Sequence, residues 1–146
     1  MVAFSQRVAN LVATEILNTE SVKMRARMIS RFINATDKLN RLGNMQSATS
    51  VLYGLQSAPV YRLKMTWHYL RRHHSIKYQR LCLLMRLYND PKSAKYKRMV
   101  DRACRTPPYI PSVAYLVSAL LARVPRPETL LPPSSIRSGI ICQPEL

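Results

Sequence analysis

The sequence predicts an all-α fold. Apolar side chains recur along the chain at the 3.6-residue spacing of amphipathic helices, and no segment shows the alternation that is typical of strands. Proline is absent from residues 1–58, so this part can form long helices, whereas nine of the ten prolines lie from Pro91 onward. We expect about seven helices within residues 1–122, followed by a disordered Pro-rich tail over residues 123–146.

Apolar stripes with a polar break between them predict the first two helices. The first helix begins near Phe4 and ends at Asn18, and its stripe consists of Phe4, Val8, Leu11, Val12 and Ile16. Thr19 or Ser21 can cap the second helix, which ends at Gly43, a residue type common at helix C-termini. The stripe expected to mark its buried face consists of Met28, Phe32, Ala35, Leu39 and Leu42.

Capping and turn residues delimit the next three helices. Asn44 can cap the third helix, which ends before Pro59, and a short fourth helix follows over about residues 61–71. Ser75 opens the fifth helix, which ends at an Asn-Asp-Pro turn that includes Pro91. The inward positions of the third and fifth helices are Ala48, Val51, Leu52, Leu55, Tyr78, Leu81, Met85 and Tyr88.

Two further helices complete the predicted fold. The sixth is indicated by a short stripe of Tyr96, Met99, Val100 and Ala103. A proline-rich loop over residues 106–111 precedes the seventh, an almost wholly apolar helix over about residues 112–122.

Positive charge is the most unusual feature of the composition. The chain carries 23 Lys+Arg against 7 Asp+Glu, a formal net charge of +16, which normally requires an acidic partner. Residues 62–105 hold 13 Lys+Arg and only two carboxylates, and we call this segment the basic half. Aromatic side chains interleave with these charges, but several lie on the apolar stripes, and no known nucleic-acid module is found. We therefore prefer a solvated basic surface to nucleic-acid binding, and an anionic membrane or an acidic protein would satisfy the same charge.

No set of residues predicts covalent catalysis or metal binding. The seven carboxylates are scattered without pairing, which disfavours general acid and base chemistry. His68, His73 and His74 lie near Trp67, but even with Cys82 their spacing matches no closed zinc site. We expect no metal and no cofactor.

The cysteines and the hydropathy bear on location. Cys82, Cys104 and Cys142 are odd in number and never form a C-x-x-C pair, which favours a reducing compartment over a disulfide framework. No apolar run approaches the length of roughly 18 residues that a membrane span needs, and the N-terminus has no signal-peptide core. We expect a cytoplasmic protein that is either soluble or peripheral at a membrane.

One stretch of sequence is more specific than any compositional feature. Residues 54–63 read G-L-Q-S-A-P-V-Y-R-L and are followed by T-W, and residues 107–111 read P-P-Y-I-P before the pair Tyr115-Leu116. Together with K-M-R-A-R-M-I-S-R-F-I in the second helix, these motifs resemble the catalytic domain of Ras-family guanine-nucleotide exchange factors. The resemblance covers residues 4–121.

The resemblance implies a fold and an activity. The family's domain is an all-helical bowl with a protruding helical hairpin, and it is longer than this chain, so we expect a partial helical bowl. In the family, the hairpin displaces the switch regions of a small GTPase and releases its nucleotide without covalent chemistry, which implies a Ras-family small GTPase as the partner. The alternative is a catalytically inactive module that binds an acidic protein or an anionic membrane through the basic half.

The resemblance also assigns roles to six residues. Leu120 would be the apolar wedge of the hairpin, and the residues on the GTPase-binding surface would be Arg25, Asn44, Gln46, Ser112 and Tyr115. Four positions depart from the family's pattern. Gln46 replaces a smaller amide, Ser112 stands where a bulky apolar residue is usual, Ala114 takes the place of a glycine, and Val124 falls where a glutamate is expected near the hairpin tip. We expect core or scaffold roles for Tyr61, Arg62, Leu63 and Trp67.

Overall fold

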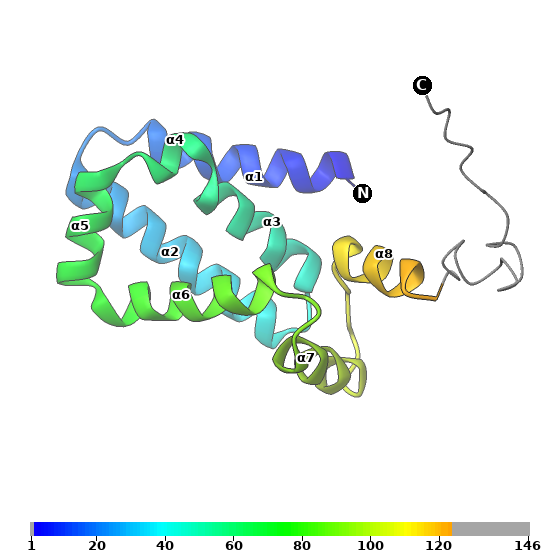
Figure 1. Cartoon of the computed structure of the whole chain (residues 1–146). Helices are drawn as coiled ribbons and strands as arrows, with labels where there is room; N and C mark the ends of the chain where they lie inside the picture. The colour runs from blue at the N-terminus through cyan, green and yellow to red at the C-terminus, as the bar shows by residue number, and fades with distance from the viewer. Residues whose placement is uncertain (1, 124–146) are drawn as a thin grey trace, which may run out of the picture.

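The computed structural model describes residues 2–123, and within them it confirms the all-α fold (Figure 1). The described residues form eight helices and no strand. The helices are α1 (Val2–Leu17), α2 (Val22–Arg41), α3 (Met45–Gln56), α4 (Ala58–Tyr61), α5 (Lys64–His73), α6 (Ser75–Asn89), α7 (Ala94–Cys104) and α8 (Val113–Leu121). Residues 124–146 of the predicted tail, and with them Val124 and Cys142, lie outside the described residues.

Most of the core lies in a bundle built around α2. This helix contacts α1, α3, α5 and α6, and Figure 1 shows α1 and α6 on opposite sides of the bundle, with α2 and α3 between them. Burial of apolar side chains between these helices supplies the main stabilising term. The buried residues of this core are Val12, Ile16, Ala26, Ile29, Ile33, Val51, Leu52, Leu55, Val60, Leu70, Leu81 and Leu84.

The predicted buried face of α2 is wrong by about one residue. The fully buried positions are Ala26, Ile29, Ile33 and Thr36, whereas Ala35 and Leu42 of the predicted stripe are exposed. Two neighbouring apolar rows run along α2, Met28 with Phe32 and Ile29 with Ile33, and the predicted stripe follows the row that lies at the edge of the core. Thr36 is tolerated inside because its hydroxyl donates a 2.8 Å hydrogen bond to the carbonyl oxygen of Phe32. In α1, Phe4 and Leu11 of the predicted stripe are likewise exposed.

The segment around Pro59 also differs from the expectation. Pro59 was expected only to end the third helix, but it occupies the first turn of a further short helix, α4. A proline is tolerated there because the amide hydrogen that it lacks would have no partner within the helix. The predicted fourth helix therefore begins only at Lys64, and the described residues contain one helix more than the seven expected. Other boundaries are confirmed: the side chain of Asn44 accepts a hydrogen bond from the Ser47 amide, and α6 begins at Ser75.

Gly54 brings α1 and α3 into close contact. A Cβ atom at this position would lie 2.6 Å from the carbonyl oxygen of Ala9 and 2.7 Å from Cβ of Val12. Both distances are too short for any side chain, so only glycine allows the two helices to pack at this separation. The glycine that begins the G-L-Q-S-A-P-V-Y-R-L motif is therefore explained by packing.

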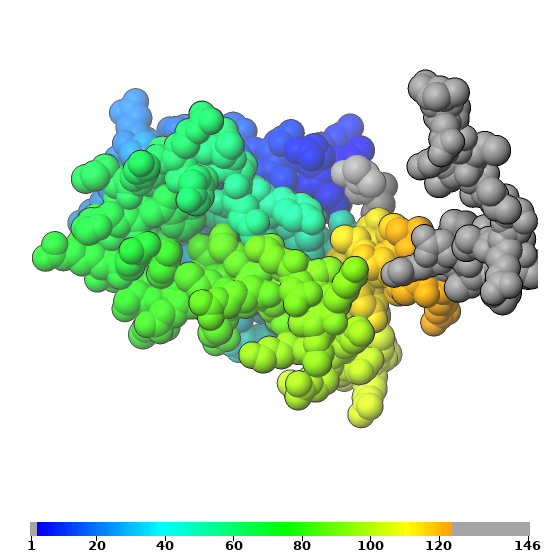
Figure 2. All heavy atoms as spheres, viewed as in Figure 1, coloured from blue at the N-terminus to red at the C-terminus, as the bar shows by residue number. Residues whose placement is uncertain are grey.

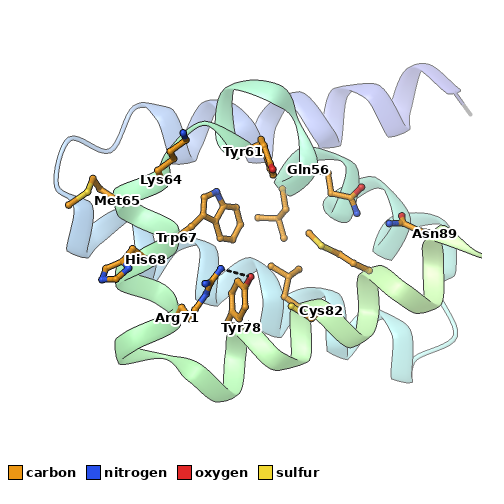
Figure 3. A pocket seen from close by; sticks show the side chains of 13 residues that line it. Gln56, Tyr61, Lys64, Met65, Trp67, His68, Arg71, Tyr78, Cys82 and Asn89 are labelled. Carbon is orange, nitrogen blue, oxygen red and sulfur yellow. Dashed lines mark hydrogen bonds between the residues drawn. The ribbon is translucent and has the colours of Figure 1, made fainter.

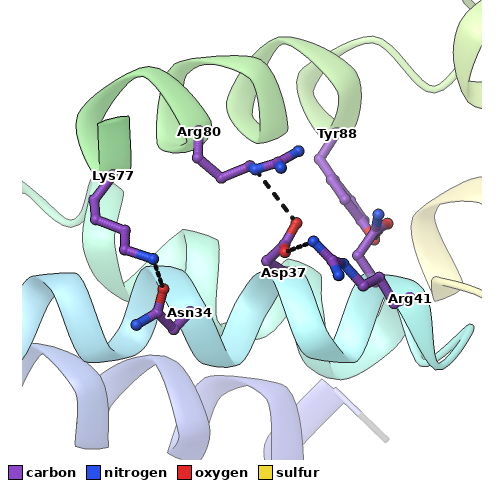
Figure 4. A network of polar contacts seen from close by, with 7 residues as sticks. Asn34, Asp37, Arg41, Lys77, Arg80 and Tyr88 are labelled. Carbon is purple, nitrogen blue, oxygen red and sulfur yellow. Dashed lines mark hydrogen bonds and ion pairs between the residues drawn. The ribbon is translucent and has the colours of Figure 1, made fainter. Parts of the chain in front are cut away.

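Polar contacts align α6 along α2 (Figure 4). The carboxylate of Asp37 lies 2.8 Å from the guanidinium of Arg41 on the same helix and 3.6 Å from that of Arg80 on α6. One turn away, Lys77 Nζ donates a 2.6 Å hydrogen bond to Oδ1 of Asn34. We call these contacts the α2–α6 polar seam. They lie at the solvent edge of the bundle, where exposed ion pairs contribute little to stability, so their main effect is to fix the register of α6 along α2.

Candidate functional site

The loop before α8 is fastened to the turn between α2 and α3. The Ile110 amide donates a 2.9 Å hydrogen bond to the carbonyl oxygen of Gly43, and the Met45 amide donates one of 2.9 Å to the carbonyl oxygen of Ile110. Gly43 has φ +72°, and a Cβ atom there would lie 3.3 Å from the carbonyl oxygen of Pro108. The peptide bond between Pro107 and Pro108 is cis. This arrangement places the start of α8 beside the start of α3.

Ser112 caps α8 from a buried position. Only 4% of its surface is exposed, and its hydroxyl accepts a 3.2 Å hydrogen bond from the Tyr115 amide. The same hydroxyl shares a 3.3 Å hydrogen bond with the phenol of Tyr96 on α7. The rings of Tyr96 and Tyr115 lie 5.5 Å apart and pack at a tilt, so Tyr96 holds both the cap and the first turn of α8.

Gln46 joins three helices through one side-chain amide. Its Oε1 accepts a 2.7 Å hydrogen bond from the Val113 amide in α8, and its Nε2 donates a hydrogen bond to Oγ of Ser5 in α1. Because a backbone amide at a helix N-terminus has no partner within the helix, the bond to Val113 satisfies a donor that would otherwise be unpaired. A shorter amide side chain would reach these partners less well.

Beyond its first turn, α8 projects from the rest of the molecule (Figures 1 and 2). It contains no charged residue and no buried residue. Leu120 is 63% exposed, and the other large apolar side chains that α8 exposes are Leu116, Val117 and Leu121. An uncharged helix with exposed leucines is typical of a surface that is covered by a partner.

The structure brings together four of the six assigned residues. Asn44 caps α3, Ser112 caps α8, and Gln46 and Tyr115 pack between the two helix starts. Leu120 lies at the far end of the same helix, α8.

Arg25 lies away from this group. Its Nε donates a 3.1 Å hydrogen bond to Oγ1 of the buried Thr66 in α5, and a terminal nitrogen donates one of 3.1 Å to the carbonyl oxygen of Thr19. These contacts tie α2 to α5 and to the loop after α1. The partly buried side chain therefore acts within the bundle, between helices that carry none of the other assigned residues.

Comparison with known families decides the identity. The family model for the RasGEF domain matches residues 1–134, which is most of the chain. The chain belongs to the RasGEF domain family.

Individual relatives agree with this assignment. The chain is 38% identical over 124 residues to "Ras-specific guanine nucleotide-releasing factor RalGPS1" of Mus musculus, an alignment that covers 83% of this chain and 20% of that protein. It is 35% identical over 124 residues to RalGPS2 of Homo sapiens, covering 82% of this chain and 20% of that protein. It is 36% identical over 109 residues to "Ras guanine nucleotide exchange factor A" of Dictyostelium discoideum, covering 71% and 16%. The chain thus spans about a fifth of the length of the first of these relatives.

On another face of this RasGEF chain, α4, α5 and α6 enclose a groove of about 830 Å³ (Figure 3). Trp67 is partly buried beneath it and donates a 2.9 Å hydrogen bond to the carbonyl oxygen of Val60, as a scaffold residue should. The expectation is wrong for Tyr61, which is 74% exposed at the groove rim, and for Arg62, which is also exposed. Val60, which precedes them, is buried and occupies the inward side of the single turn of α4, so Tyr61 and Arg62 face solvent.

The histidines show no sign of a metal centre. The His73 ring stacks on Tyr69 at 4.0 Å between ring centroids, and its Nδ1 lies 3.1 Å from the carbonyl oxygen of Tyr69. In the part of the chain that the structure describes, no three His, Cys, Asp or Glu side chains are grouped as metal ligands would be.

None of the described helices combines the length and the hydropathy needed to cross a membrane.

Tyr96 is the important residue that sequence analysis placed only in the core. It packs edge-on against Tyr88, with 5.7 Å between ring centroids, and burial raises the pKa of both phenols. Its stripe predicts burial, but nothing in the sequence pairs its hydroxyl with Ser112, sixteen residues away. That pairing depends on how the loop before α8 folds back.

Proposed function

We propose that this chain acts in guanine-nucleotide exchange on a Ras-family small GTPase. The GTPase would contact the exposed face of α8 and the adjoining starts of α3 and α8, which carry Asn44, Gln46, Ser112 and Tyr115 and which we call the α3–α8 junction. The match of the RasGEF family model to residues 1–134 carries this proposal. The relatives are named as Ras-specific releasing factors and a Ras exchange factor, which supports the same partner class.

Exchange of this kind is done by binding. A protein that prefers the nucleotide-free GTPase shifts the equilibrium toward nucleotide release by its difference in affinity for the two states. Such a protein needs a positioned surface and no acid and base pair, and the scattered carboxylates fit this requirement. Leu120 supplies an apolar side chain that could insert between GTPase elements, while Gln46, Ser112 and Tyr96 fix the direction of α8.

Release of a labelled nucleotide from purified Ras, Rap and Ral proteins tests the proposal. The chain should accelerate release from at least one of them, and Leu120→Asp should reduce the acceleration about tenfold or more, the loss expected for one central apolar contact. Leu11→Asp is the matched control, because Leu11 on α1 is 58% exposed against 63% for Leu120. No acceleration over the intrinsic rate, or an equal loss in both variants, would contradict the proposal.

Arg25 has an indirect part in this proposal. Since its guanidinium contacts Thr66 and the carbonyl oxygen of Thr19, Arg25→Glu should weaken GTPase binding by loosening the bundle. The urea midpoint of the free chain should therefore fall together with the affinity. A variant that lost affinity with an unchanged midpoint would instead place Arg25 in direct contact with the GTPase.

The charge of the basic half favours a second candidate function. We propose that it attracts the protein to an anionic membrane surface or an acidic protein, either as the sole role of an inactive module or as a means of recruitment from the cytoplasm. The 13 Lys+Arg against two carboxylates in residues 62–105 support this. Sedimentation with phosphatidylserine vesicles at low and high salt tests the lipid form. Binding that is absent or insensitive to salt would exclude it.

A further inference from the structure

A groove of about 680 Å³ separates the end of α2 from α7. The apolar and backbone groups that line it include Gly43, Leu87 and Pro108. Four cationic side chains line it, and no carboxylate does; the cations are Arg41, Lys95, Arg98 and Arg102. We call it the α2–α7 groove.

The cations of α7 share one face of the helix. Lys95, Arg98 and Arg102 are spaced by three and four residues, so their side chains lie one above another. Tyr96 and Val100 on the opposite face are buried and anchor the helix, and Ser93 caps it by accepting a hydrogen bond from the Tyr96 amide. The helix therefore has a fixed orientation and presents these exposed cations along the face that lines the groove, where Arg98 Nε also donates a 3.2 Å hydrogen bond to the carbonyl oxygen of Ala94.

Little negative charge competes for these cations. The basic half contains only Asp90 and Asp101, and neither lines the groove. Arg41 is paired with Asp37 at 2.8 Å, but within the described residues no ion pair engages Lys95 or Arg102. A concavity lined by one sign of charge raises the local concentration of ions of the opposite sign.

We propose that the α2–α7 groove binds a compact polyphosphorylated ligand of the inositol phosphate class, either as a soluble molecule or as a phosphoinositide headgroup. Guanidinium groups bind phosphate oxygens in bidentate pairs, and several phosphates on one small ring match several cations around one groove. The volume lies in the range of small-ligand sites, whereas a diffuse basic surface would need no such concavity. This site goes beyond the GTPase surface and beyond general attraction to a membrane.

The groove borders the loop that holds α8. Gly43, Pro107 and Pro108 line the groove, and the Gly43 carbonyl also accepts the hydrogen bond from Ile110 that fastens this loop. A ligand in the groove would therefore contact one side of the α3–α8 junction.

Titration calorimetry of the whole chain with inositol hexakisphosphate at physiological salt tests the site. We expect saturable binding of one ligand, weakened at least thirtyfold by the double variant Lys95→Glu with Arg102→Glu. The matched control is Arg62→Glu with Arg72→Glu, which makes the same change in net charge at exposed positions of the basic half outside the groove. The control should weaken binding less than threefold. Equal losses in the two double variants would overturn the proposal.

Vesicles distinguish the two sources of the ligand. Phosphatidylcholine vesicles that contain phosphatidylinositol 4,5-bisphosphate are compared with phosphatidylserine vesicles of the same total charge. A preference for the phosphoinositide that is lost in the groove variant and kept in the control supports a lipid headgroup. Saturable binding of the soluble ligand without that preference supports a soluble ligand. Failure of both, with exchange activity retained, would overturn this site and leave the proposed function standing.

Discussion

The bundle around α2 and the end formed by α7 and α8 are stabilised in different ways. Twelve buried residues form the core of the bundle, whereas three, Met45, Tyr96 and Val100, form the cluster beneath the α7–α8 end. At that end, the orientation of α8 depends on a buried cap, the Gln46 amide and the tilted packing of the Tyr96 and Tyr115 rings. Apolar burial therefore holds the scaffold, and a few directional contacts hold the helix that we propose meets the GTPase. We therefore expect the α7–α8 end to open at a lower free-energy cost than the core of the bundle.

The largest effect should come from Gly54→Ala in the bundle. The new Cβ would meet the Ala9 carbonyl oxygen and Cβ of Val12 in α1. The first is a backbone atom and the second is bonded directly to the backbone, so neither can rotate away. We expect α1 and α3 to separate and the free energy of unfolding to fall by about 3 kcal/mol. Urea denaturation followed by circular dichroism measures this. Tyr53→Ala, at an exposed position of the same helix, is the control, and a loss below about 1 kcal/mol for Gly54→Ala would contradict close packing.

Gly43→Ala should act at the α7–α8 end instead. A left-handed conformation costs a residue other than glycine about 1 to 2 kcal/mol, and the Pro108 carbonyl oxygen adds a close contact. Amide hydrogen exchange should therefore speed up about five- to thirtyfold at Ile110 and Met45, whose hydrogen bonds fasten the loop.

The rest of the molecule serves as the internal control for Gly43→Ala. Exchange in the core segments of α1 and α3 should change less than at the loop if the two regions open separately. Equal acceleration in both regions would show that they unfold as one unit and would remove the contrast between them.

Helix ends and the buried face of α3 could be predicted because their signals are local. Asn44 and Gly43 mark helix ends through their own backbone preferences, and the stripe of α3 is confirmed because small and large apolar residues coincide on its inner face. The face of α2 was predicted about one residue off because Met28 and Phe32 form an apolar row next to the buried Ile29 and Ile33, and hydropathy alone does not choose between two adjacent apolar rows.

The candidate site was only partly within reach of such arguments. Its residues could be assigned through the family resemblance, but their contacts could not, because those contacts join distant parts of the chain. Gln46 binds the backbone 67 residues onward, and Arg25 bonds Thr66, 41 residues onward. No periodicity or capping rule specifies such partners. They follow from the packing of α8 and α5 against the bundle, which only the folded structure shows.

The tyrosine cluster at the α7–α8 end, which consists of Tyr88, Tyr96, Tyr109 and Tyr115, should make stability depend on alkaline pH. Burial raises the pKa of the Tyr88 phenol above its ordinary value of 10.0, so the folded state keeps the proton while the unfolded state loses it. The contribution of Tyr88 is therefore complete below pH 10 and is lost as the pH rises through the higher folded-state pKa. Between pH 9 and 10.5, the free energy of unfolding should fall by about 0.5 to 1 kcal/mol because of Tyr88.

The variant Tyr88→Phe isolates this effect. It removes the 2.7 Å hydrogen bond to Asn40 at every pH, but it should also flatten the decline in stability above pH 10. Tyr61→Phe, at an exposed position outside the cluster, should leave the decline unchanged. Parallel declines in Tyr88→Phe and the unmodified chain would show that Tyr88 does not sense pH.

The smallest effect should come from Arg80→Ala in the α2–α6 polar seam. Arg80 is half exposed and lies 3.6 Å from Asp37, which keeps its closer partner Arg41 at 2.8 Å. Loss of an exposed ion pair of this kind should cost about 0.5 kcal/mol or less, and the difference should shrink in high salt because the charges are screened. Urea denaturation at two salt concentrations measures both values. A loss above about 1 kcal/mol would mean that charge stabilises the bundle as well as apolar burial, and the contrast with the α7–α8 end would then be one of degree.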